Sequence, residues 1–271
     1  MSGNQQPVTL VTGGGTGIGR SVALRMASLG WRVAVNYAGS RAAAEETATA
    51  CLAAGSDGLA VQGDVADDTA CRRLVAATLD RWGRLDALVN NAGVTAFARA
   101  DELESLNADD FARIFAVNVA GAYQMARAAA PALRYSAGGD LPAPGWRPGI
   151  VNISSHGAFS GLGSSMAYAA SKGALNTLTL ALARSLAPDI RVNAVCPGFV
   201  DTDWVRRTMA DEDYRGFRDR VAAISPLRRI STPDEIAEAV SWFLTCGASV
   251  TGQLLVVDAG VHLTIRTPID S

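Results

Sequence analysis

Short apolar, β-branched runs alternate with segments of helical periodicity along the whole chain. The runs predict strands at 8–12, 33–36, 59–62, 87–90, 150–154, 191–196 and 254–257. The segments between them predict helices at 20–29, 41–54, 67–82, 109–133, 165–187 and 233–244. Such alternation is typical of parallel strands joined by crossover helices. We therefore predict an α/β fold: a Rossmann-type, doubly wound parallel sheet of about seven strands, with helices on both faces and ligands outside the C-terminal strand ends.

Two segments interrupt this alternation. Residues 135–149 are rich in Gly and Pro and are predicted to form an irregular surface insertion. Residues 201–230 are polar, with seven arginines, and are interpreted either as a mobile substrate flap or as a solvated helical hairpin. No repeat, linker or second domain is visible, so residues 1–271 are interpreted as a single nucleotide-binding domain.

The composition argues against several classes of partner. The net charge of −2 predicts no attraction to nucleic acid. No apolar run approaches the roughly 18 residues that span a membrane, and residues 1–7 lack the pattern of a secretory signal. The four cysteines have no C-x-x-C spacing and the two histidines are far apart in sequence. We therefore expect free thiols, no metal site, no membrane contact and a cytoplasmic location.

A glycine-rich turn, GGGTGIG at 13–19, follows the first predicted strand and precedes the first predicted helix. Bare backbone N–H groups and the helix dipole make such a turn a site for phosphate. Residues 14–21 also come within one residue of the P-loop pattern, but Arg20 replaces its lysine. The turn is therefore interpreted as part of a dinucleotide site rather than a nucleoside triphosphatase site.

The ends of the next two strands carry polar residues that bear on cofactor choice. An acidic residue at the end of the second strand would bind the adenosine ribose of NAD. This chain has Asn36, Tyr37, Ser40 and Arg41 there, and Arg41 is suited to pair with a 2′-phosphate. NADP(H) is therefore favoured, with NAD(H) as the alternative. Asp64 and Val65, at the end of the third strand, are predicted to border the adenine.

Tyr168 and Lys172 lie four positions apart in a predicted helix, which places them on one face. A lysine near a tyrosine favours the phenolate, so we expect the pKa of Tyr168 to lie below its ordinary value. A tyrosine tuned in this way exchanges a proton with an alcohol or a carbonyl. Lys172 is the single lysine among 24 basic residues, which indicates a specific need for an ammonium group there.

Several motifs follow one another along the chain: Thr12-Gly13-x-x-x-Gly17-x-Gly19, Asn90-Asn91-Ala92-Gly93, Asn118, Ser155, Tyr168, Lys172 and Cys196-Pro197-Gly198. The chain resembles the short-chain dehydrogenase/reductase family over essentially its whole length. In pattern it is most similar to 3-oxoacyl-[acyl-carrier-protein] reductases. Ser155 rather than Ser154 takes the catalytic place, because it lies thirteen residues before Tyr168.

The resemblance implies an NAD(P)-dependent oxidoreductase that transfers a hydride between the cofactor and a carbonyl or secondary alcohol. Tyr168 is then the general acid/base, Ser155 binds the substrate oxygen, Lys172 holds the nicotinamide ribose, and Asn118 holds a water. The substrate is expected to be a small 3-oxoacyl, sugar or cyclic ketone. The family also implies a homotetramer or homodimer.

The residues that are expected to contact the cofactor lie near the C-terminal ends of the predicted strands. They are Gly13, Gly15, Thr16, Gly17, Ile18, Gly19, Asn36, Tyr37, Ser40, Arg41, Asp64, Val65, Asn91, Ala92, Gly93, Tyr168, Lys172, Pro197, Gly198, Val200 and Thr202. Thr16 stands where many NADP-using members of the family have arginine. Apolar residues at 159, 162, 204 and 209 suggest a partly hydrophobic substrate cleft.

The sequence argues against four alternatives. A non-catalytic dinucleotide sensor would typically lack the tyrosine and lysine, and this chain has both. An enoyl-type reductase would show Tyr-x6-Lys, but residue 175 is Leu. An epimerase usually needs a longer C-terminal domain. His156 follows the serine pair, yet adjacent side chains seldom face each other, so a Ser–His dyad is not favoured.

Overall fold

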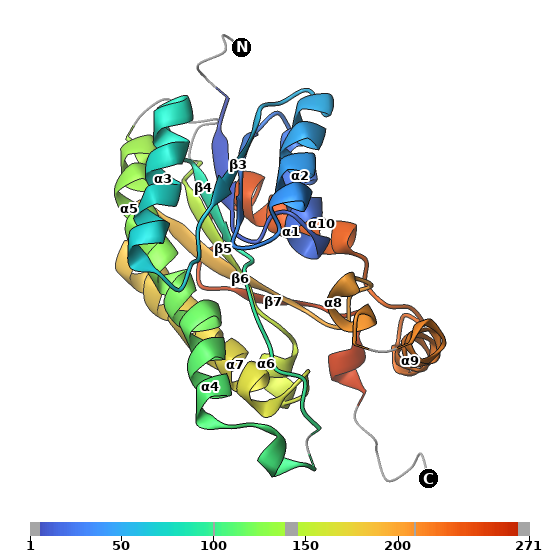
Figure 1. Cartoon of the computed structure of the whole chain (residues 1–271). Coiled ribbons are helices and arrows are strands. Elements are labelled where there is room, and N and C mark those ends of the chain that lie inside the picture. Colours follow the sequence, from blue (N-terminus) through green and yellow to red (C-terminus); the bar gives the residue numbers. More distant parts are fainter. Residues whose placement is uncertain (1–5, 100, 139–145, 209, 265–271) are drawn as a thin grey trace.

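A seven-stranded parallel sheet forms the centre of the molecule, in the strand order β3-β2-β1-β4-β5-β6-β7 (Figure 1). The computed structural model describes residues 6–99, 101–138, 146–208 and 210–264. The strands are β1 (Val8–Val11), β2 (Arg32–Tyr37), β3 (Gly58–Gln62), β4 (Ala87–Asn90), β5 (Gly149–Ile153), β6 (Arg191–Pro197) and β7 (Leu254–Val257). The predicted doubly wound α/β fold is confirmed.

Helices cover both faces of the sheet, which explains why the central strands read as continuous apolar runs. One face carries α1 (Gly17–Ser28), α2 (Arg41–Ala53) and α10 (Pro233–Thr245). The other carries α3 (Asp68–Trp82), α5 (Ala122–Ala137) and α7 (Met166–Leu186). Every residue of β4 and β5 is buried between these layers. Each layer buries its own cluster of apolar side chains against the sheet.

The long helix predicted at 109–133 consists of three consecutive parts. They are α4 (Ala108–Phe115), a π-helical segment η2 (Ala116–Gly121) and α5. Asn107 caps α4 and forms a reciprocal capping box with Asp110. The π-helical segment carries Asn118, and π-helical turns are frequent at functional sites.

The prediction of an irregular surface insertion at 135–149 is partly wrong. Helix α5 continues to Ala137, and residues 139–145 lie outside the described part of the chain. Trp146 is buried, with its indole nitrogen donating to the Leu244 carbonyl (2.8 Å) and its ring 5.9 Å from that of Trp31. A large aromatic ring with a satisfied N–H gains more from the core than from solvent, so the end of this segment belongs to the core.

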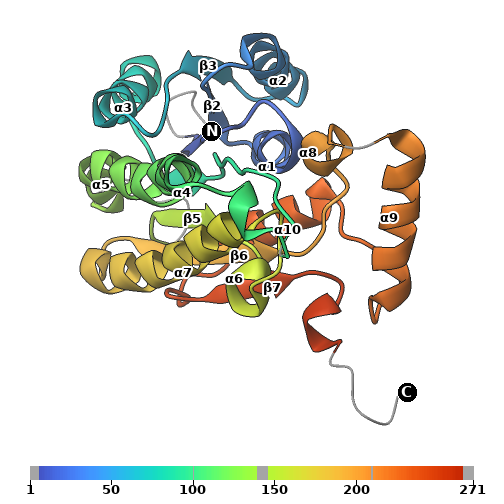
Figure 2. The same ribbon diagram turned by 60° about the horizontal axis from the view of Figure 1, so that its bottom comes forward.

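The polar segment 201–230 forms two helices, α8 (Asp203–Arg206) and α9 (Asp211–Ile224), and α9 lies at the edge of the molecule beyond α8 (Figure 2). It is not wholly solvated, because Tyr214 is buried and its hydroxyl donates to Asp201 (2.6 Å). The Phe199 ring packs against Tyr214 and Phe217. The helical interpretation is confirmed for this segment, and its motion as a flap stays a prediction.

The functional edge lies where the chain order in the sheet reverses, between β1 and β4. In sheets of this type, ligands bind outside the C-terminal strand ends at that switch point. The remaining short elements are η1 (Leu103–Ser105), α6 (Gly157–Ser160) and η3 (Val261–Leu263). Within the described residues, none of the helices combines the length and apolarity needed to cross a bilayer.

Candidate active site

Tyr168 and Lys172 lie in the first two turns of α7, on the same face. The side chain of Ser165 caps this helix by accepting a hydrogen bond from the Tyr168 backbone N–H (3.2 Å). The Lys172 Nζ lies 5.5 Å from the centre of the Tyr168 ring. The four-residue spacing therefore brings phenol and ammonium together, as the sequence predicts.

The loop after β5 brings Ser155 to this pair. The Ser155 hydroxyl accepts a hydrogen bond from the Gly157 N–H (3.1 Å) and is hydrogen-bonded to the Tyr168 phenol. Ser154, in contrast, donates to the backbone carbonyl of Lys172 (3.3 Å) and is fully enclosed. Of the two serines, Ser155 is thus the one beside the phenol.

Burial sets the protonation of both groups on α7. It raises the pKa of Tyr168 to about 12, although the hydrogen bond with Ser155 opposes this shift. It also lowers the pKa of Lys172 to about 8, with the nearby Cys196 opposing. The expected lowering of the Tyr168 pKa is not met in this structure, because desolvation dominates and the Lys172 Nζ donates to the Ile153 carbonyl (2.7 Å). At neutral pH, Tyr168 is a protonated phenol.

Asn118 connects the segment after β4 to α7. Its side-chain oxygen accepts from the Val94 N–H (2.8 Å), and its amide nitrogen donates to the Val94 carbonyl and the Ser171 hydroxyl (both 3.0 Å). A Cβ placed on Gly93 would lie 3.4 Å from the Asn118 oxygen and 3.8 Å from the Lys172 Nζ. Gly93, Asn118 and Lys172 therefore converge, and the water predicted at Asn118 stays a prediction.

The glycine-rich turn wraps closely around the N-terminus of α1. Gly13 and Gly17 have φ angles of 59° and 51°, a region that favours glycine. A Cβ on Gly19 would lie 2.3 Å from the Gly13 carbonyl oxygen, so this position has no room for a side chain. Thr16 is exposed at the start of α1 and makes no side-chain capping hydrogen bond. The turn presents backbone and one hydroxyl to the functional edge.

Asparagines brace this turn from two sides. The Asn91 amide nitrogen donates to the carbonyls of Thr12 (2.9 Å) and Gly13 (3.0 Å). The Asn36 side-chain oxygen accepts from the Gly13 N–H (3.3 Å), while its amide nitrogen donates to backbone carbonyls, that of Gly63 at 2.8 Å. Their side chains thus support the turn, which restricts how either one contacts a cofactor.

The residues predicted to select the cofactor are split between the interior and the surface. Tyr37 is buried at the end of β2, whereas Ser40 and Arg41 are exposed at the start of α2. The Arg41 guanidinium donates to Glu45 one turn later (2.8 Å). Arg41 therefore lies at the predicted edge, with an exposed carboxylate as its partner.

Asp64 and Val65 follow β3, as predicted, and differ in exposure. Asp64 is exposed, and its carboxylate accepts from the Ala66 N–H (2.9 Å). Val65 is buried against η2, where a Cβ on Gly121 would lie 2.8 Å from it. Asp64 is therefore open to solvent after β3, whereas Val65 is part of the packing between this segment and η2.

The turn after β6 lies opposite the glycine-rich turn. Gly198 donates its N–H to the Val257 carbonyl (3.0 Å), which ties this turn to β7. Thr202 caps α8, and its methyl group lies 3.5 Å from the position of a Cβ on Gly17. Val200 is buried and forms a bridge with Ser231. Pro197, Gly198 and Thr202 therefore border the same space as the glycine-rich turn.

Apolar side chains flank Tyr168 at the mouth of the site. The Trp204 ring centre lies 6.4 Å from that of Tyr168, and a Cβ on Gly163 would lie 3.2 Å from the tyrosine ring. Phe159, in α6, and Leu162, just after this helix, are also exposed. Of the four residues that suggested a hydrophobic cleft, Trp204 lies beside the phenol, and Met209 lies outside the described residues.

One contact at this mouth escaped the sequence analysis. The hydroxyls of Thr95 and Ser164 are hydrogen-bonded (2.6 Å), and the Ala98 N–H donates to the Ser164 carbonyl (2.9 Å). These bonds tie the segment after β4 to the loop before α7. The two residues lie 69 positions apart, and no local pattern pairs them, so only the fold reveals this contact.

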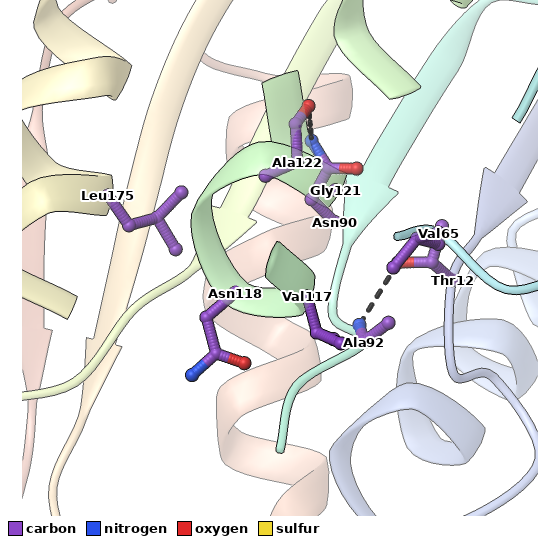
Figure 3. A pocket seen from close by; sticks show the side chains of 9 residues that line it. All are labelled: Thr12, Val65, Asn90, Ala92, Val117, Asn118, Gly121, Ala122 and Leu175. Carbon is purple, nitrogen blue, oxygen red and sulfur yellow. Dashed lines mark hydrogen bonds between the residues drawn. The ribbon is translucent and has the colours of Figure 1, made fainter. Parts of the chain in front are cut away.

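A small recess lies next to the functional edge, between β4, η2 and α7 (Figure 3). Asn90 donates across it to the Ala122 carbonyl (3.3 Å), and the Thr12 hydroxyl accepts from the Ala92 N–H (3.0 Å). Asn118 and Leu175 line its other side. The recess is mainly apolar and is closed by these bonds, so it is a packing feature behind the site.

Comparisons with known proteins agree with this arrangement. A family model described as enoyl-(acyl carrier protein) reductase matches residues 13–262. The granaticin polyketide synthase putative ketoacyl reductase 2 of Streptomyces violaceoruber is 39% identical, over 96% of this chain and 97% of its own. The 3-oxoacyl-[acyl-carrier-protein] reductase of a Synechocystis strain is 32% identical, over 94% of this chain and 96% of its own.

A solved structure gives the same answer. The crystal structure of a putative short-chain dehydrogenase/reductase from Burkholderia xenovorans matches with a TM-score of 0.87 and 41% identity. The match covers 96% of this chain and 99% of that one. Fold, sequence and the order of the motifs therefore agree, and the chain belongs to the short-chain dehydrogenase/reductase family, whose members are oxidoreductases that use nicotinamide cofactors.

Proposed function

We propose that this protein reduces a ketone to a secondary alcohol with a nicotinamide cofactor, NADP(H) in preference to NAD(H). The observation that carries the proposal is the grouping of three side chains: the Tyr168 phenol is hydrogen-bonded to Ser155, and the Lys172 Nζ lies 5.5 Å from the centre of its ring. A protonated phenol is suited to donate a proton, which is the step that carbonyl reduction needs. The same groups run the reverse reaction when the phenol is deprotonated.

The shape of the functional edge fits a dinucleotide. The turn at 13–19 has left-handed glycines and no room for a Cβ at Gly19, so a pyrophosphate would meet bare backbone at the N-terminus of α1. Gly93 and the Lys172 Nζ lie close together, where a ribose would be held. We propose that the turn at 197–202 contacts the nicotinamide end.

The proposed reaction divides its tasks among three side chains. When bound, the cofactor supplies the hydride that the carbonyl carbon accepts. Tyr168 donates its phenolic proton to the carbonyl oxygen, and Ser155 donates a hydrogen bond to that oxygen as negative charge develops on it. Lys172 binds the ribose and places a positive charge near the phenolate that remains. Asn118, with a water, is proposed to connect Lys172 to solvent for reprotonation.

The preference for NADP(H) rests on the end of β2. No carboxylate occupies positions 36–41, so nothing there repels a 2′-phosphate. Thr16, Ser40 and Arg41 are exposed around the same point. The pair between Arg41 and Glu45 is exposed and separated by one helical turn, and such pairs contribute little to stability. A phosphate is a stronger partner for that guanidinium.

We propose an apolar ketone, such as a 3-oxoacyl thioester or a cyclic ketone, as the substrate. Trp204 lies beside the phenol, and Phe159 and Leu162, in the segment that follows Ser155, leave apolar surface exposed. Two relatives are named for reduction of ketoacyl groups. Exposed apolar residues on the outer faces of α7 and α10, Leu180 and Trp242, support assembly into a homotetramer or homodimer. The cytoplasm is the proposed location.

Replacement of Tyr168 by Phe tests this proposal. The ring and its packing stay, so NADPH binding followed by nicotinamide fluorescence should change little. Ketone-dependent oxidation of NADPH, followed by absorbance, should fall about 10²–10⁴-fold because the proton donor is lost. Tyr135→Phe, at an 80% exposed tyrosine on α5, is the matched control and should keep full turnover. Undiminished turnover in Tyr168→Phe would refute the mechanism.

A further inference from the structure

Both histidines of the chain meet at one buried carboxylate. Asp258 directly follows β7, and its side chain is only 1% exposed. It accepts hydrogen bonds from the backbone N–H groups of Gly260 (2.9 Å) and His262 (2.7 Å), and it faces the His262 Nδ1 at 2.9 Å. The His156 Nδ1 lies 3.6 Å from the Asp258 Oδ2. The reaction proposed above uses none of these three side chains.

Asp258 also supports the turn that borders the nicotinamide end. A Cβ on Gly198 would lie only 2.4 Å from the Asp258 Cβ, so the turn presses directly on this residue. The His156 N–H donates to the Pro197 carbonyl (2.8 Å). Since His156 immediately follows Ser155, the carboxylate, the turn and the serine form one closely packed unit.

His156 is held in an incompletely bonded state. Its Nδ1 is enclosed and has no hydrogen-bond partner among the described residues, although Asp258 lies 3.6 Å away. Burial lowers the pKa of His156, against the opposing effect of the Asp258 carboxylate, and His262 adds to the lowering. The imidazole is therefore neutral near pH 7. Its Nδ1 must carry the proton, because a bare nitrogen would face a carboxylate.

The other charged groups nearby do not alter this arrangement. Burial by itself would raise the pKa of Asp258, but the hydrogen bonds from His262 and Gly260 outweigh it and hold that pKa below its usual value. The segment packed against Ala259 contributes Arg228, whose guanidinium donates to the Ala223 carbonyl. Among the described residues, no group of three ligands is arranged to hold a metal ion.

We propose that Asp258 and His156 are a positioning pair for Ser155, and that the pair holds the serine correctly only while His156 is neutral. This inference rests on the proposed reductase function. A protonated His156 would be drawn to the carboxylate, closing the 3.6 Å gap to a charge-assisted hydrogen bond of about 2.8 Å. That shift would carry Ser155 away from Tyr168. Misplacement by an ångström costs up to a hundredfold in rate.

Kinetics of four proteins test the pair: the wild type, His156→Gln, Asp258→Asn and the matched control His262→Gln. His262 contacts the same carboxylate but, unlike His156, is not adjacent to Ser155 in the chain. With NADPH and a ketone that the wild type reduces, kcat should fall below pH 6.5 in the wild type. His262→Gln should keep an acid limb, displaced to higher pH because His262 no longer lowers the pKa of His156. His156→Gln, which cannot titrate, should lose this acid limb. Asp258→Asn should lower kcat at pH 7 roughly tenfold, with NADPH affinity nearly unchanged.

A second measurement does not depend on activity. With only two histidines, the imidazole Cε1–H resonances are readily assigned by comparison with His156→Gln. The His156 resonance should titrate below 6.5, and lower still in Asp258→Asn, because the carboxylate that favours the cation is gone. In the wild type, its midpoint should coincide with that of kcat.

Distinct outcomes separate the two proposals. An acid limb that persists in His156→Gln, or that disappears equally in His262→Gln, would overturn the positioning pair while the reductase stands. A His156 resonance that is indifferent to Asp258→Asn would also overturn it, even in a protein that reduces no ketone. Failure to reduce any ketone, with the titration as expected, would count against the reductase and would leave the coupling of Asp258 to His156 intact.

Discussion

The two halves of the site use different parts of the chain. Around β1 and β2, the glycine-rich turn offers backbone, and the side chains of Asn36 and Asn91 are occupied in supporting it. Around β5 and α7, the active groups are side chains, and their surroundings are what shift their pKa values. Burial keeps Tyr168 protonated and weakens the proton affinity of Lys172.

This difference shows how one fold meets two demands. A pyrophosphate needs many donors at fixed positions, which closely packed backbone provides without side-chain entropy. Proton transfer needs a group whose affinity for the proton suits the reaction, which desolvation provides. The first half should therefore be sensitive to added volume, and the second to changes in charge.

Gly19→Ala tests the first half and should have the largest effect. The added methyl group would lie 2.3 Å from the Gly13 carbonyl oxygen and 2.5 Å from the Asn91 amide nitrogen, so the turn must shift. A shift of this kind should weaken NADPH binding roughly hundredfold, as measured by fluorescence titration. Gly138→Ala is the matched control, because its added methyl group would meet only the Tyr135 carbonyl oxygen, at an ordinary contact distance of 3.7 Å. Equal binding by both variants would show that the turn does not hold the cofactor.

Lys172→Met tests the second half through its pH dependence. The Lys172 pKa is lowered from 10.5 to about 8 in the folded protein, so the unfolded chain binds more protons between these values. The wild type should therefore gain stability relative to the variant as the pH rises from 8 to 10, by ~2 kcal/mol.

Urea unfolding of both cofactor-free proteins at several pH values measures this difference. Comparison with the variant cancels the titration of Cys51 and Cys71, whose pKa values do not depend on Lys172. Parallel pH profiles would mean that Lys172 is not desolvated, and the contrast between the two halves would weaken.

Arg41→Ala should have the smallest effect, because the residue is exposed. If its guanidinium meets the 2′-phosphate, the Kd for NADPH should rise about tenfold, equivalent to ~1.4 kcal/mol, and that for NADH should not change. Arg25→Ala, at an exposed arginine in the last turn of α1, serves as the control. An equal loss for both cofactors would return Arg41 to a surface role and leave the NADP(H) preference without support.

The fold and the positions of the site motifs could be predicted from the sequence because both depend on local patterns. Alternating apolar runs and helical segments predicted all seven strands. The glycine-rich turn lies before α1, and Tyr168 and Lys172 share one face of α7, as expected. The insertion was harder: its Gly and Pro content indicated a surface loop, yet Trp146 is buried beside Trp31. Composition averages over a segment and cannot show where one large side chain finds space.

The sequence by itself determined which groups reach the functional edge, since strand ends and helix periodicity place them there. Only the tertiary structure decided their protonation and their distant partners. Desolvation, which depends on every packed neighbour, raised the pKa of Tyr168 where spacing alone suggested the opposite. Likewise, His156 and Asp258 are 102 residues apart in the chain and meet only because β5, β6 and β7 are adjacent in the sheet. Long-range contacts and burial are properties of the folded packing, and no local pattern encodes them.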